Sequence, residues 1–215
     1  MPTRPGVRAP ELHLARKMLF SPTMKPTRFL ALAAFALPVL AHAHPGHDGH
    51  ELTWDFATGA SHPLLGLDHL LAMVAVGLWA AQLGGRSRWL LPVAFVGLMA
   101  LGAVTGHAGR PFPGLEQAIA ASILVLGLLI AAAVRLPVSA GMAVVGAFAA
   151  FHGMAHGAEM PASAGGLAYG LGFAATTALL HAVGLGLGLA LKDRAQAVRL
   201  AGGVVALAGA LAFVL

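Results

Sequence analysis

The feature that most constrains this chain is a nearly continuous apolar sequence from residue 62 onward, interrupted only by short polar segments. Each apolar segment is close to the roughly 20 residues that a helix needs to cross a bilayer. Helices are favoured because the hydrocarbon core contains no water to hydrogen-bond the backbone N–H and C=O groups, and a helix pairs these groups internally. The sequence therefore predicts an all-α integral membrane protein, a six-helix transmembrane bundle over residues 62–215. Its expected spans are 63–83, 89–106, 114–134, 137–156, 165–191 and 197–215.

Composition supports this class and narrows the possible chemistry. The chain is 58% hydrophobic and only 10% charged, as few soluble domains are. It contains no cysteine, which excludes disulfides, thiolate metal sites and cysteine nucleophiles. Any metal must therefore be held by histidine, carboxylate, methionine or backbone oxygen.

Residues 24–43 have the pattern of a cleavable signal peptide. Lys25 and Arg28 precede the apolar stretch 29–40, which is too short for a comfortable span, and Ala41-His42-Ala43 fits the cleavage rule. The alternative is an uncleaved first membrane helix. Residues 1–23 are interpreted as a non-native or disordered extension. Because residues 1–43 carry the whole net charge of +5, the basicity does not indicate a nucleic-acid partner.

The distribution of basic residues predicts the orientation. The segments after the first, third and fifth spans should be cytoplasmic if a cleaved signal leaves the N-terminus outside. They carry six basic residues and the outer segments carry one, Arg110. The signal peptide and the distribution of basic residues thus indicate the same orientation. We therefore expect a multi-pass protein of the bacterial inner membrane with both mature termini periplasmic.

Ionisable side chains gather at the outer ends of the expected spans. Insertion of a charge at mid-membrane costs roughly 2.5–3.5 kcal/mol, so such groups tend to be buried and functional. Imidazoles and carboxylates without thiolates suit a first-row divalent cation. The alternatives are hydrogen-bonded packing histidines, a helix-start role for Asp68 and a solvated Glu159. The candidate metal residues are His62, Asp68, His69, Glu116, His152, His156 and Glu159.

Spacing places some of these residues on shared helix faces. His152, His156 and Glu159 follow an i, i+4, i+7 pattern, and His62 and His69 are seven apart. His181 lies deeper, either as a further step for the ion or as a hydrogen-bonded packing residue. The segment 44–61 is expected to be a periplasmic His-rich tail. It either captures metal or is simply polar, and its candidate ligands are His44, His47 and His50.

These motifs are similar to those of a known family. HPLLGLDHLLAMVAVGLWA (62–80) resembles the His-Pro-x-x-Gly-x-Asp-His motif of the HupE/UreJ family. FHGMAHGAE (151–159) resembles its Phe-His-Gly-x-Ala-His-Gly-x-Glu signature, and LEQAIAAS (115–122) its Glu-bearing third-helix segment. The resemblance extends over the signal peptide and all six spans.

The resemblance implies a permease for nickel, in some members cobalt, often serving hydrogenase or urease maturation. Functional positions of the family correspond to His62, Asp68, His69, Phe95, Glu116, His156 and Glu159, and His152 matches the second motif. Phe95 rests on the resemblance alone, because an aromatic residue in an apolar span is core by default.

We therefore expect a secondary permease rather than an enzyme, with Ni²⁺ or Co²⁺ as transported substrate and no prosthetic group. Its expected partners are the divalent metal ion and the lipid bilayer, and its oligomeric state stays open. No nucleotide-binding motif is present. Membrane potential or protonation of His or Glu could drive inward release. The alternative is a membrane-embedded metalloenzyme, in which His and carboxylate hold a metal that activates water.

Overall fold

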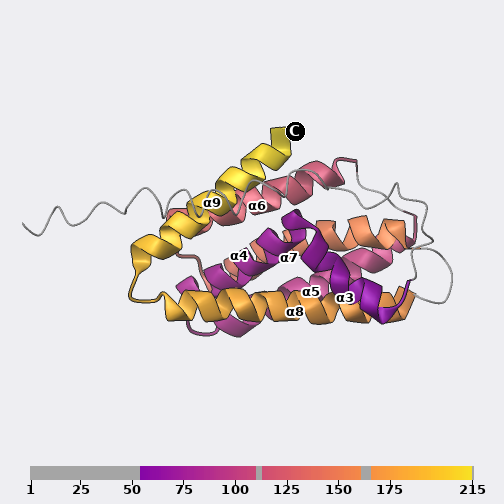
Figure 1. Ribbon diagram of the computed structural model, residues 1–215, viewed down its shortest axis with the longest axis horizontal. Coiled ribbons are helices and arrows are strands. Elements are labelled where there is room, and N and C mark those ends of the chain that lie inside the picture. Colours follow the sequence, from indigo (N-terminus) through magenta and orange to yellow (C-terminus); the bar gives the residue numbers. More distant parts are fainter. Residues whose placement is uncertain (1–53, 110–112, 161–165, 215) are drawn as a thin grey trace, which may run out of the picture. The chain divides into compact units, whose positions relative to one another are not determined.

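The computed structural model describes residues 54–109, 113–160 and 166–214, and within them all regular structure is helical (Figure 1). The expected all-α class is confirmed there. The expected extension, signal peptide and His-rich tail lie outside the described residues, apart from the end of the tail segment. The helices are α3 (Phe56–Leu65), α4 (Leu67–Leu83), α5 (Ser87–His107), α6 (Leu115–Ala131), α7 (Val138–Glu159), α8 (Gly166–Ala190) and α9 (Ala195–Val214).

Four of the described helices, α5, α7, α8 and α9, are long and apolar enough to cross a membrane. The pair α3 and α4 would make a fifth span if its two parts are taken together. Helix α6 has 17 residues and is shorter than the others. Large apolar side chains such as Leu101, Val104 and Leu167 are exposed on these helices, as expected in lipid. The chain is therefore a multi-pass membrane protein, and the six-span count remains a prediction.

The first expected span, 63–83, differs from a single straight helix. Helix α3 begins earlier, at Phe56, and the chain bends by 83° between α3 and α4. Gly66 forms the break, with extended backbone angles of φ −84° and ψ 115°. Its N–H still donates to the carbonyl of His62, while its own carbonyl accepts from Leu70. Glycine disfavours the helical conformation by about 1 kcal/mol relative to alanine, so a break in the helix at Gly66 costs little free energy.

Small residues bring the helices into close contact. Helix α5 packs on α7. Helices α3 and α4 both pack on α8, and α6 packs on α9. A Cβ added to Gly77 of α4 would overlap the carbonyl oxygen of His181, and one on Gly184 would overlap that of Val74. Gly184 of α8 thus allows close helix packing, whereas Gly170 of the same helix faces open space.

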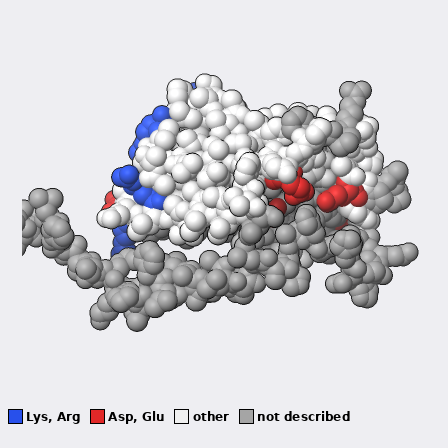
Figure 2. All heavy atoms as spheres, turned by 90° about the horizontal axis from the view of Figure 1, so that it is seen from above, with Lys and Arg blue, Asp and Glu red and all other residues white. Residues whose placement is uncertain are grey.

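Charged side chains separate along the bundle. Lys and Arg gather at one end of the face in Figure 2, and acidic side chains lie mainly toward the other. The basic residues that the structure describes lie in or beside the connections α4–α5, α6–α7 and α8–α9. The opposite end holds the start of α4 and the end of α7, which carry the histidine motifs. The histidines therefore lie at the end away from the basic connections.

Candidate metal centre

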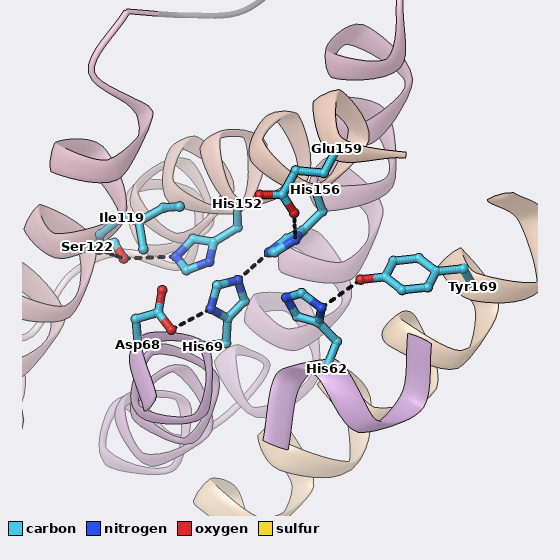
Figure 3. A network of polar contacts seen from close by, with 9 residues as sticks. All are labelled: His62, Asp68, His69, Ile119, Ser122, His152, His156, Glu159 and Tyr169. Atoms are coloured by element: carbon cyan, nitrogen blue, oxygen red, sulfur yellow. Dashed lines mark hydrogen bonds and ion pairs between the residues drawn. The ribbon is translucent and has the colours of Figure 1, made fainter. Parts of the chain in front are cut away.

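Three histidines from three different helices come together at the end of the bundle. His62 comes from α3, His69 from the first turn of α4 and His156 from the last turns of α7 (Figure 3). One ring nitrogen of each lies within 4.8 Å of those of the other two. His69 and His156 are buried and their Nε2 atoms face each other directly, while His62 is half-buried. We call His62, His69 and His156 the histidine trio.

The bend at Gly66 makes this arrangement possible. In a continuous helix, residues seven apart are about 10.5 Å apart along the axis, too far for two rings to bind one ion. With the bend, the rings of His62 and His69 have centroids 5.7 Å apart. A cation bound to imidazole nitrogens at about 2.1 Å needs only small adjustments of the three rings. The break in the first span is therefore part of the site.

Each trio imidazole has an oxygen close to its Nδ1 atom. Oδ1 of Asp68 lies 2.7 Å from Nδ1 of His69, and the Tyr169 hydroxyl lies 2.9 Å from Nδ1 of His62. Oε2 of Glu159 lies 3.6 Å from Nδ1 of His156. Only the Tyr169–His62 contact is a hydrogen bond, because Nδ1 of His69 and Nδ1 of His156 have no hydrogen-bond partner among the described residues. The carboxylates of Asp68 and Glu159 lie beside these two rings, where oxygen partners of metal-binding histidines commonly lie.

One aromatic ring packs against all three imidazoles. The Phe173 ring of α8 lies 5.7 Å from His62, 6.0 Å from His69 and 4.7 Å from His156, measured between centroids. The side chain is itself buried. Phe173 therefore limits the orientations that the trio rings can take, and it excludes water from one side of the site.

His152 lies beside the trio with a different set of contacts. Ser122 donates its hydroxyl proton to the carbonyl of Ile119, so its oxygen can accept from Nε2 of His152 at 3.1 Å. The lone pair of His152 then resides on Nδ1, which has no hydrogen-bond partner among the described residues. The His152 ring lies 5.2 Å from that of His69. His152 thus has an unpartnered ring nitrogen beside the trio, but it does not belong to the group of nitrogens that lie within 4.8 Å of one another.

The other residues expected in the site are spread around it. Glu159 is mostly exposed, with 58% of its side chain accessible, and Asp68 is 35% accessible. Glu116 is exposed in the first turn of α6 and is not part of the trio. Phe95 is fully buried and packs against the rings of His152 and His181, with centroids at 5.9 and 5.0 Å. The histidines at 44, 47 and 50 lie outside the described residues.

Three contributors were missed by the sequence reasoning: Tyr169, Phe173 and Ser122. Phe173 and Ser122 carry no signal in an apolar span, since both residue types are common in membrane helices. Tyr169 did carry one, because it is the sole tyrosine of the chain and lies in a strongly apolar segment. A buried phenol usually finds a hydrogen-bond partner.

Replacing Tyr169 by phenylalanine is expected to weaken Ni²⁺ binding by roughly 10–100-fold, as for other partners of metal-binding histidines. The change removes the oxygen beside His62 but keeps the ring that packs on Trp54. Calorimetric titration of the purified protein with Ni²⁺ measures the effect. An unchanged affinity in a protein of unchanged melting temperature would show that the hydroxyl does not orient His62.

Comparison with known proteins gives one family and one close relative. The family described as HupE / UreJ protein matches residues 30–212. A protein named Protein HupE, from Rhizobium leguminosarum bv. viciae, is 48% identical over 182 residues, which cover 83% of this chain and 93% of that protein. No solved structure matches the chain.

Proposed function

Because the chain belongs to the HupE/UreJ family, we propose that it is a secondary permease that takes up a divalent transition metal, foremost Ni²⁺. The observation that carries this proposal is the histidine trio, whose nitrogens lie within 4.8 Å of one another. The association of the family with nickel and cobalt supports these metals as the substrate. Nickel delivered in this way would supply hydrogenase or urease maturation.

The donor set of the trio suits an ion that must bind and then leave. Imidazole nitrogens bind first-row divalent cations well, and the absence of cysteine removes the ligands that would hold them most firmly. A permeation site must compensate for lost hydration and still release its ion. Three neutral imidazoles, completed by water or by His152, meet both needs.

The carboxylates around the trio have a separate role in this proposal. Asp68 and Glu159 are partly accessible and lie beside His69 and His156. They attract the hydrated cation and orient the imidazoles that replace its water. Glu116 and the His44, His47 and His50 tail would raise the local concentration of cation before it reaches the trio.

The charge distribution supports an outward-facing trio. Basic residues cluster at the end of the bundle away from the histidines, and such residues mark the cytoplasmic side. We therefore propose that the protein lies in the bacterial inner membrane with the trio and both mature termini on the periplasmic side. After binding, the ion passes Phe95 on its way inward.

Uptake of radioactive ⁶³Ni²⁺ by nickel-starved cells tests the proposal. Expression of the chain should raise the initial uptake rate, and excess unlabelled Ni²⁺ should compete more strongly than Co²⁺, with Zn²⁺ and Mn²⁺ weaker still. No increase over cells lacking the chain would contradict it. Stoichiometric metal that resists chelators in the purified protein would instead favour a membrane-embedded metalloenzyme.

A further inference from the structure

His181 has no hydrogen-bond partner for either ring nitrogen in the part of the chain that the structure describes. It lies in the middle of α8 and its side chain is 1% exposed. A buried polar group without a partner is costly, and native structures contain few of them. The interpretation of His181 as a hydrogen-bonded packing residue therefore finds no support among the described residues. Its two unpartnered ring nitrogens are available to bind a ligand.

Thr177 shares this property one helical turn earlier. Its hydroxyl is buried and has no partner among the described residues, and the side chain is 0% exposed. Residues four apart on a helix face the same side, with Cβ atoms roughly 5–6 Å apart. Two unpartnered polar groups thus meet on one face of α8, where membrane helices usually bury apolar atoms.

The buried side of α8 continues from the histidine trio. Tyr169 binds His62, Phe173 packs against the trio, and Thr177 and His181 follow at four-residue steps. From Phe173 to His181 the helix rises about 12 Å, so His181 lies well inside the bundle. Phe95 also connects His181 with the site, because its ring packs on both His152 and His181.

A groove of about 450 Å³ lies between α5 and α8, and its lining includes His181 and Arg88 near the start of α5. The groove opens at the outer surface of the bundle, where Trp89 and Val93 of its lining are exposed. His181 thus lies at the buried wall of a groove that reaches Arg88.

We infer that Thr177 and His181 form a second cation-binding position inside the bundle, a relay for the transported divalent metal beyond Phe95. The inference rests on the proposed function. The imidazole nitrogen and the hydroxyl oxygen supply two ligands, and water that travels with the ion supplies the rest. Aromatic contact from Phe95 adds a weak attraction for the cation. Two protein ligands hold the ion less firmly than the trio, as a step toward release requires.

The test compares binding with transport in the purified full-length chain. Calorimetry measures Ni²⁺ affinity in detergent, and ⁶³Ni²⁺ flux into proteoliposomes measures the transport rate. His181→Gln should lower the initial flux at saturating Ni²⁺ at least tenfold and leave the affinity of the trio within about twofold. A structural role alone would not separate the two readouts.

Thr177 provides a matched pair of variants that keeps the test valid if His181→Gln fails to fold. Thr177→Val keeps the shape of the side chain without the hydroxyl, and it should reduce the flux while the melting temperature stays equal or rises. Thr177→Ser restores the hydroxyl and should restore most of the flux. Thr176→Val, at the neighbouring buried threonine, is the control and should transport normally.

The outcomes separate the two proposals. Full flux in both His181→Gln and Thr177→Val, with normal flux in the unmutated protein, would overturn the relay and leave the permease intact. Absence of Ni²⁺ flux in the unmutated protein would overturn the permease and, with it, the relay. Loss of flux together with loss of trio affinity in both variants would also overturn the relay, because the effect would then lie at the trio.

Discussion

Replacing His69 by alanine is expected to reduce Ni²⁺ uptake to the level of cells that lack the protein. His69 is buried at the centre of the trio, where its Nε2 faces that of His156 and its ring also neighbours His62 and His152. Changing an orienting partner already costs roughly 10–100-fold in metal affinity, so loss of a ligand should cost at least about 100-fold. His156→Ala should have the same effect, since it removes the opposing nitrogen.

The matched control for these two variants is His107→Ala. His107 is exposed at the end of α5 and does not belong to the trio, so this variant should take up Ni²⁺ at the normal rate. Uptake is measured as the initial rate of ⁶³Ni²⁺ accumulation, corrected for the amount of protein in the membrane. Normal uptake by His69→Ala at normal expression would rule out the trio as the binding site.

Gly66→Ala is expected to weaken Ni²⁺ binding by about 10–100-fold, although residue 66 donates no ligand. A Cβ there would lie 2.8 Å from Oδ1 of Asp68 and 3.1 Å from Nδ1 of His69, so it would displace the pair that orients this imidazole. Alanine also favours helix over glycine by about 1 kcal/mol, which acts against the 83° bend. Both effects move His69 away from His62.

Gly170→Ala is the control for this substitution. Gly170 lies in α8, and a Cβ there would meet no atom within 4 Å. The affinity of the Gly170→Ala variant for Ni²⁺, measured by calorimetric titration, should therefore match that of the unmutated protein. If Gly66→Ala bound Ni²⁺ as tightly as Gly170→Ala, the geometry at the bend would not be needed to assemble the trio.

The helical class and much of the site could be predicted from sequence for simple physical reasons. Apolar segments of span length have few structural options in a bilayer, which is why the helices lie close to their expected ranges. The charge distribution set one end of the bundle apart from the other, so His62, His69 and His156 could be expected at one level. Helical spacing likewise predicted that His156 and Glu159 share a face.

The remaining features depend on three-dimensional contacts that a linear pattern does not contain. The chain bends at Gly66, a residue whose type is common within the spans, so the sequence did not reveal that His62 folds back toward His69. The roles of Tyr169 and Phe173 arise only when α8 packs against α3. Glu116 was expected among the metal residues, and the structure places it exposed in the first turn of α6, outside the trio.

X-ray absorption at the nickel edge tests most directly the claim that three imidazoles bind one ion together. The sample is the purified full-length chain with His44, His47 and His50 replaced by asparagine and loaded with one equivalent of Ni²⁺, so that the tail contributes no ligand. The account predicts at least three imidazole nitrogens near 2.1 Å, and a loss of this signature in His69→Ala. A shell of oxygen ligands alone, unchanged by His69→Ala, would contradict it.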